Sequence, residues 1–409
     1  MGPIALTDID GLLKDVLREP IVNQINKETM ILNQIEAGVD DFDIAGETIK
    51  HPVMLTRNTK MGFRQTGAYM PSGGNAKVKQ VTSTPVSLYA YVEFEGQAIR
   101  RTLNQEGAFE KLLQFELKNA AESCRMEINR ASYGFGRGDL GILDGAPVGN
   151  VITVESDTIA NVAPNMSWFE EGMELEAYDA ATLATRRGTY VIDTISPDTR
   201  EITLVDATGL QDGDYLFVNR NKGNEPMGFL GFADNGTYVP NLGGVSETDF
   251  HRWNGHVDTA VAVRAITEEM LQNMITKIER AGQGQLIMTT EAIRNKIARL
   301  IKSTMVQPQT LDLKGGFKAL SYNGYPIWHD IYAPYGTILH GIMQYVKIHQ
   351  AFPQKDKKFN AFMWDDLDGS ILHGVRDTDV FWAKSVMDYN LTTKRRNAFG
   401  RIDMIDANL

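Results

Sequence analysis

The chain has 409 residues, a formal net charge of −11 and 43% hydrophobic residues, enough for two or three domains with ordinary buried cores. The acidic balance argues against a general nucleic-acid coat, because duplex binding depends on clustered Lys and Arg. A single cysteine excludes an intrachain disulfide and a cysteine-rich zinc site. The sequence has neither a run of 18 apolar residues nor a secretory start, so we expect a protein made and kept in the cytoplasm, away from membranes.

The first 49 residues predict two short amphipathic helices. Apolar residues fall on one helical face from Leu6 to Arg18, Pro20 interrupts the pattern, and a second helical stretch runs from Ile21 to Glu36. So little chain surrounds these segments that they cannot form a core of their own. We expect an N-terminal arm that packs on another domain or subunit.

Residues 50–100 have β character. PVMLTRN is strand-like, the following stretch is rich in Gly and small polar residues, and VSLYAYVEF alternates with period two. We expect a long hairpin with a wide tip, in which VSLYAYVEF is the return strand. The alternation predicts one buried face and one face that meets solvent or a partner.

The same region is basic within an acidic chain. No acidic residue lies between Glu47 and Glu93, whereas six cations do: Lys50, Arg57, Lys60, Arg64, Lys77 and Lys79. One interpretation is a solvated basic hairpin, since exposed charges alone specify little. The other is an arm that reaches an acidic neighbour.

Residues 104–133 predict the most regular helix of the chain, about 45 Å long at 1.5 Å per residue. Its remaining faces carry a row of glutamates on which a basic arm from the same or an adjacent copy could lie. On charge alone, we expect an inter-subunit contact formed by Arg57, Lys60, Arg64, Tyr69, Lys77, Lys79, Glu106, Glu110 and Glu116.

The second half of the chain contains two further kinds of pattern. Residues 151–222 predict short strands in a small β-barrel or sandwich, with 13 acidic and 5 basic residues and therefore a net charge of −8. Residues 245–350 alternate between helices and strands, and Thr267 and Thr290 are suitable helix N-caps. The tail returns to β character and should pair with earlier strands; it holds the basic group Lys394, Arg395, Arg396 and Arg401.

Motifs for catalysis are missing. The sequence contains no P-loop and no G-x-S-x-G elbow, and its seven histidines never fall at a metal-ligand spacing. Paired carboxylates are uninformative in an acidic protein without geometry. We therefore expect no enzyme activity, no cofactor and no metal.

The order of these elements resembles the major capsid proteins of tailed bacteriophages of the Hong Kong 97 type (HK97-like). The basic hairpin at 58–84 looks like the family's extended loop, and the helix at 104–133 is similar to its spine helix. LTTKRRNAFGRI resembles its closing segment. The most specific stretch is LSYNGYPIWHDIYAPYGTILHGI, in which the matching residues are Gly324, Pro326, Ile327, Asp330, Pro334, Gly336 and Thr337.

The resemblance implies an α+β, HK97-like capsid fold with an N-arm, an extended β-hairpin loop, a long spine helix, an α/β axial domain and an inserted small β-barrel or sandwich domain. The implied boundaries are 1–49 for the N-terminal arm, 50–100 for the extended loop, 101–147 for the peripheral domain with the spine helix, 148–230 for the inserted β domain, 231–350 for the axial domain and 351–409 for the C-terminal peripheral segment.

The implied function is self-assembly as pentamers and hexamers into an icosahedral head that encloses double-stranded DNA without sequence-specific binding. The virion would be its final location. Implied partners are other copies of the chain, portal and scaffolding proteins, and a decoration or cement protein. Two alternatives stay open: an encapsulin-type compartment shell, and a nucleic-acid-binding protein that uses its basic hairpin, whose binding would weaken steeply with salt.

Overall fold

The structure, a computed structural model, describes residues 31, 35, 48–70, 72–97, 106–155, 162–179, 183–304, 310–312, 318–350, 363–364, 372–376 and 378–406. The helices expected in the N-terminal arm lie outside these residues, except that Ile31 and Ile35 are helical and buried. None of the described helices is long and apolar enough to span a membrane.

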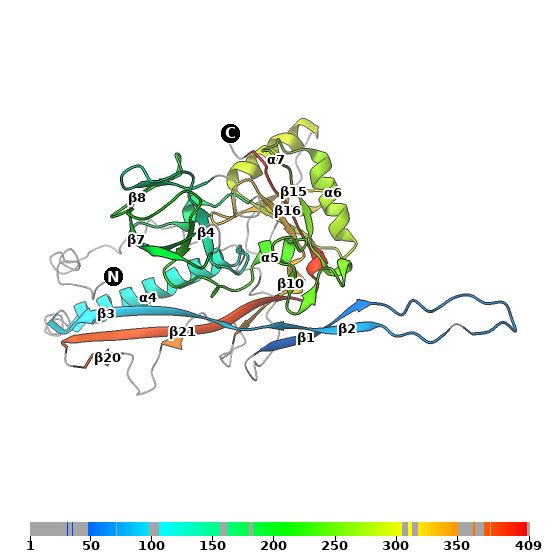
Figure 1. Cartoon of the computed structure of the whole chain (residues 1–409), viewed down its shortest axis with the longest axis horizontal. Helices are drawn as coiled ribbons and strands as arrows, with labels where there is room; N and C mark the ends of the chain where they lie inside the picture. The colour runs from blue at the N-terminus through cyan, green and yellow to red at the C-terminus, as the bar shows by residue number, and fades with distance from the viewer. Residues whose placement is uncertain are drawn as a thin grey trace.

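A two-stranded arm projects from the body (Figure 1). Its strands are β1 (Ile49–Thr56) and β2 (Lys77–Ser83), which pair antiparallel from Ile49 opposite Ser83 to Thr56 opposite Lys77. Residues 57–76 continue outward and form the tip. The expected hairpin therefore exists, with its wide Gly-rich end farthest from the body.

The expected return strand is wrong. VSLYAYVEF forms β3 (Val86–Glu95), but β1 pairs with β2, and β3 pairs antiparallel with β21 (Val380–Thr393) over ten residues. Thr84 and Pro85 separate β2 from β3. The alternation of β3 is as expected, with Phe94 buried and Tyr89 and Tyr91 exposed, but its partner lies some 300 residues along the chain, where a local pattern gives no signal.

The long helix packs along the sheet that contains β3 and β21, and together they form an elongated two-layer unit. Helix α4 (Glu106–Ala131) contains 26 residues, about 39 Å at 1.5 Å per residue, and it runs beside β3 and β21 (Figure 1). It begins and ends within two residues of the predicted bounds. The other strands of this sheet are β18 (Val346–Gln350), β19 (Met363–Trp364) and β20 (His373–Gly374), which all pair with β21.

The acidic segment forms a six-stranded antiparallel sheet in the order β4-β9-β6-β7-β8-β5. Its strands are β4 (Asp139–Ile142), β5 (Val151–Thr153), β6 (Glu174–Tyr178), β7 (Arg186–Ser196), β8 (Glu201–Leu204) and β9 (Tyr215–Val218). The two edge strands meet at a bridge between Leu143 and Val154. The sheet thereby closes on itself around buried side chains such as Leu175, Ile202 and Leu216.

The third layer is a seven-stranded mixed sheet in the order β12-β22-β17-β13-β16-β15-β14. Its strands are β12 (His256–Asp258), β13 (Leu286–Thr289), β14 (Thr310–Asp312), β15 (Lys318–Tyr322), β16 (Tyr325–His329), β17 (Ile338–Gly341) and β22 (Phe399–Ile402). Every residue of β13, β17 and β22 is buried, which requires cover on both faces. Three helices pack against this sheet: α5 (Phe229–Ala233), α6 (Glu268–Glu279) and α7 (Glu291–Thr304).

The predicted N-cap is confirmed for α6, where Thr267 accepts a hydrogen bond from the Met270 N–H. For α7 it is wrong: the helix begins at Glu291, directly after Thr290, but the buried Thr290 Oγ1 has no hydrogen-bond partner among the described residues. The tail pairs with earlier strands as expected, β21 with β3 and β22 with β12 and β17. Its basic group is not a surface patch, because Arg396 and Arg401 are 0% and 1% exposed.

Candidate subunit interface

Among the residues that the structure describes, the contacts between the arm and the body lie at the base of the arm. Leu55 and Val81 are buried there, the Thr82 N–H donates to the Gly243 carbonyl at 2.9 Å, and His51 Nε2 lies 3.1 Å from the Thr393 carbonyl oxygen. Farther out, Asn58 Nδ2 donates to the Gly74 carbonyl at 2.6 Å and joins the two sides of the arm. The tip therefore has no support from the body of its own chain.

The tip nevertheless carries large apolar side chains. The exposed fractions are 69% for Met61, 104% for Phe63, 97% for Tyr69 and 92% for Met70. Scattered apolar residues are normal on a protein surface, but four on one unsupported segment expose an apolar patch that a partner can bury. This is the chemistry of a contact with another chain.

A tight turn shapes the tip between these residues. The Ala68 N–H donates to the Gln65 carbonyl at 3.0 Å, and Gly67, the third residue of that turn, has φ of 86°. A type II turn requires a positive φ there, which glycine adopts without strain. Phe63 and Tyr69 consequently flank a defined turn.

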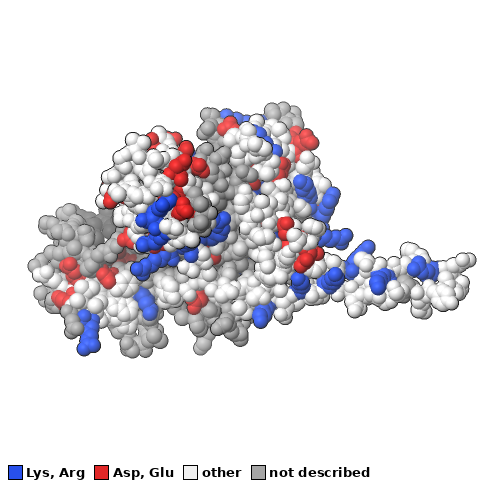
Figure 2. All heavy atoms as spheres, viewed as in Figure 1, with Lys and Arg blue, Asp and Glu red and all other residues white. Residues whose placement is uncertain are grey.

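Most of the predicted cations lie on the arm and face solvent. Arg57, Lys60, Arg64 and Lys77 are exposed. Lys79 differs, because its Nζ lies 3.9 Å from Asp249 Oδ2 and 5.1 Å from the centre of the Phe250 ring. It fastens the arm to its own body, while the other four are placed for a partner; Figure 2 shows the arm as a basic projection without acidic side chains on this face.

The predicted glutamates lie on α4, which extends toward the opposite end of the molecule from the arm tip (Figure 1). The side chains of Glu106 and Glu110 lie outside the described part. Glu116 is half-buried, and burial raises its pKa. The structure does not bring the arm of one copy onto α4 of the same copy, so a contact between them needs two copies. Of the exposed apolar side chains of the tip, Tyr69 alone was named from the sequence; Met61, Phe63 and Met70 were missed, although apolar residues in a Gly-rich polar stretch were a usable signal.

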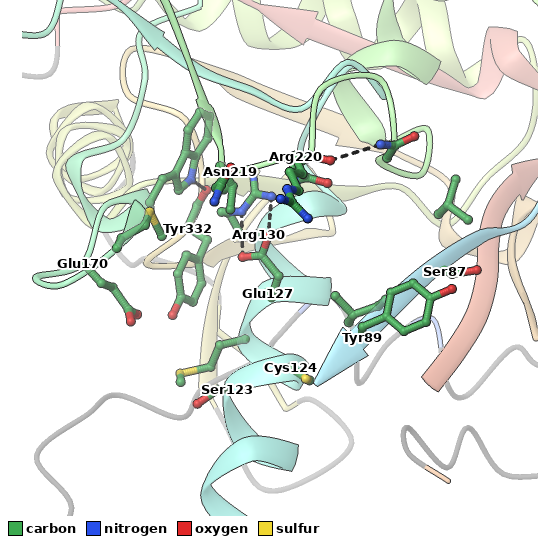
Figure 3. A pocket seen from close by; sticks show the side chains of 18 of the residues that line it. Ser87, Tyr89, Ser123, Cys124, Glu127, Arg130, Glu170, Asn219, Arg220 and Tyr332 are labelled. Carbon is green, nitrogen blue, oxygen red and sulfur yellow. Dashed lines mark hydrogen bonds and ion pairs between the residues drawn. The ribbon is translucent and has the colours of Figure 1, made fainter. Parts of the chain in front are cut away.

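A cavity of about 840 Å³ lies between β3, α4 and the closed sheet. Arg130 donates to Glu127 at 2.9 Å from Nε and 2.6 Å from a terminal nitrogen (Figure 3). It also donates to Glu225. Ser123 and Cys124 also line the cavity, but no histidine does. Burial raises the pKa of the Cys124 thiol to about 12, which opposes nucleophilic chemistry.

The remaining titratable groups also favour structural roles. Burial lowers the pKa of His340 to about 3 and that of His349 to about 4. In the described ranges, no group of three or more His, Cys, Asp and Glu side chains could hold a metal ion.

Comparisons with known proteins place the fold. No protein-family model matches the chain, and no curated protein matches its sequence. A chain of the cyanophage A-1(L) capsid asymmetric unit superposes with a TM-score of 0.60 at 12% identity, covering 97% of this chain and 98% of that one.

Two further solved structures are similar over nearly the whole chain, but both TM-scores are 0.48, below 0.5, so neither supports an assignment of the fold. One is Mycobacterium phage Bobi, 10% identical over 99% of both chains. The other is the holo-SrpI encapsulin complex of Synechococcus elongatus, 9% identical over 99% of this chain and 98% of that one. The assignment therefore rests on the cyanophage chain, and the protein has the α+β fold of a bacteriophage capsid subunit.

Proposed function

We propose that the chain is a major capsid protein of a tailed bacteriophage, which assembles as pentamers and hexamers into an icosahedral head around double-stranded DNA. The observation that carries this proposal is the arm: a basic projection with an exposed apolar tip, anchored at its base to a body with a capsid fold. A free chain gains nothing from such a tip, whereas a neighbour that buries it gains the hydrophobic free energy.

In HK97-like terms, the arm is the extended loop, α4 is the spine helix, and the seven-stranded sheet with its helices is the axial domain. The closed six-stranded sheet is then an insertion between spine helix and axial domain. The arm of one copy lies on the next copy, where its cations meet acidic side chains and its tip is covered. Because such a contact repeats around a closed ring, a modest energy per copy is multiplied.

The proposal also includes partners of the complete virion. Portal and scaffolding proteins, and a decoration or cement protein, would join the shell, and the chain itself would catalyse nothing. The net charge of −11 suits a container for DNA, because a basic lining would hold the genome and hinder its movement.

Negative-stain electron microscopy with size-exclusion chromatography, at low and high salt, tests the proposal. Icosahedral particles, rings of five or six copies, or tubes that persist in high salt would support it. A monomer or dimer that never assembles, even with viral partners supplied, would refute it. Shells that contain an enzyme cargo would favour the encapsulin alternative, and salt-sensitive DNA binding without shells would favour the nucleic-acid-binding alternative.

A further inference from the structure

A second cavity, of about 610 Å³, lies where the arm meets the body. Its walls come from four places: the end of β1, the turn at His251–Trp253, the C-terminal end of α6, and the segment between β21 and β22. Its lining contains no carboxylate, although the chain is acidic overall. It does contain six cations: Arg57, Arg252, Lys277, Arg280, Lys394 and Arg395.

Two of the six are already engaged. Arg395 donates to the Ala281 carbonyl and packs over the Tyr345 ring, and Lys394 has interactions elsewhere. The other four, Arg57, Arg252, Lys277 and Arg280, are exposed. Within the part of the chain that the structure describes, none of these four makes an ion pair.

The four cations converge from three separate elements. Lys277 and Arg280 lie at the C-terminal end of α6, where positive charge stabilises the helix dipole, but this role does not extend to Arg57 and Arg252. The positive charge of this cluster also acts on His256: burial is the main cause of its lowered pKa, and Lys277 and Arg280 lower that pKa further. Like charges gathered in one pocket repel each other, and an anionic partner relieves that repulsion.

A matching acidic surface exists on the same molecule. The hairpin of β7 and β8 exposes Asp193, Asp198 and Glu201. The cation of that turn, Arg200, is directed inward, where it donates to the backbone carbonyls of Val154, Glu155 and Pro164. Within the described ranges, none of these three carboxylates forms an ion pair, so the turn presents negative charge.

The two surfaces lie apart along the long axis of the molecule (Figure 1). The closed sheet with β7 and β8 occupies one side of the body, and the arm leaves from the other. A hairpin and a pocket so placed cannot meet within one copy, but a head-to-tail contact between copies brings them together, and such contacts close into rings.

We propose that the cationic pocket at the base of the arm binds the carboxylate-bearing β7–β8 hairpin of a second copy. The inference rests on the proposed function and adds a specific contact to it. A protein partner fits better than nucleic acid, because Val53, Leu55 and Ala281 give the pocket an apolar part. Trp253 also lines the pocket but is only 3% exposed, so its ring is not available to stack on bases. The arginines can hold carboxylates through paired N–H groups.

A charge-swap experiment tests this contact on the full chain. Lys277→Glu/Arg280→Glu reverses the pocket, Asp198→Lys/Glu201→Lys reverses the hairpin, and a third variant combines both. We expect each reversal alone to lower the assembled fraction on the order of tenfold in sedimentation velocity and electron microscopy, and the combination to restore most of it. Lys277→Gln/Arg280→Gln should give an intermediate loss.

Arg299→Glu is the matched control, since Arg299 is an exposed cation on α7 outside the pocket, and it should assemble as wild type. Circular dichroism checks that each variant is folded. The inference would be overturned if either single reversal assembled as well as the wild type, or if the combined variant did not regain assembly. In both cases, shells formed by the wild type would still support the proposed function. The inference would also be overturned if the pocket variant bound duplex DNA more weakly than the wild type but assembled equally well. A wild type that stays monomeric throughout would refute both.

Discussion

The arm tip offers a direct separation of folding from assembly. Phe63 and Tyr69 are 104% and 97% exposed, so their side chains contribute no packing to their own chain. We expect Phe63→Ala/Tyr69→Ala to change the free energy of unfolding by no more than about 0.5 kcal/mol, as is usual for surface substitutions away from contacts.

The effect on assembly should be much larger. Burying one large apolar side chain against a neighbour contributes about 1.5–3 kcal/mol, so two contribute about 3–6 kcal/mol per arm when both are covered. At about 1.4 kcal/mol per factor of ten, the association constant of each contact falls by roughly two to four orders of magnitude. Because each copy in a ring repeats the loss, the concentration at which particles form should rise steeply.

Urea unfolding measures the first quantity, and sedimentation velocity over a concentration series measures the second. Val261→Ala is a suitable control, because Val261 is 103% exposed and lies between β12 and α6, outside the arm, the cationic pocket and the β7–β8 hairpin. Assembly of the tip variant at the wild-type concentration would contradict this prediction, as would a loss of unfolding free energy as large as the loss of association energy.

Three further predictions concern the body. Burial lowers the pKa of His340 from 6.5 to about 3, so below pH 6.5 the unfolded chain binds a proton that the folded chain does not. Stability therefore falls toward acid, and His340 alone contributes up to about 1.4 kcal/mol per pH unit. His340→Leu should remove this part of the slope of urea stability between pH 6.5 and 5, while His349 still contributes its own. Asp234→Ala removes the carboxylate that pairs with the buried Arg396 and leaves the buried Arg401 with Asp403 alone. This should cost about 3–5 kcal/mol in urea unfolding; a loss below about 1 kcal/mol would contradict the prediction. With a pKa of about 12, only roughly one part in 10,000 of the Cys124 thiol should be thiolate at pH 8. Cys124 should therefore react with a thiol reagent only when the chain unfolds. Fast labelling of the native chain would contradict this prediction.

Periodicity in the sequence identified elements but not their partners. The three- and four-residue spacing of apolar positions located α4 to within two residues, and Thr267 marked the start of α6. The same kind of evidence identified β3 as a strand and then paired it with the wrong neighbour. Whether a segment forms a strand depends on side chains within about ten residues. Which strand it pairs with depends on the tertiary structure: β3 pairs with β21 and packs on α4, and both partners are set by parts of the chain outside the local pattern.

Charge counting had a similar limit at the candidate interface. It located the basic arm correctly, because a run without acidic residues is visible in the sequence. It could not distinguish Lys79, which pairs with Asp249 of its own body, from Lys60 and Lys77, which stay exposed. Nor could it show that Arg396 and Arg401 are buried on Asp234, since burial of a charge is decided by residues distant in sequence.

The anchoring of the arm has a consequence for how one sequence could serve in rings of different size. Leu55 and Val81 fix the base, but the described residues beyond Thr56 contact little except each other. The direction of the tip is thus determined by whatever neighbour covers Phe63 and Tyr69, and a change in that direction breaks no packing inside the subunit. In the proposed shell, pentamers and hexamers can therefore differ at the arm while the buried strands β13, β17 and β22 keep one arrangement.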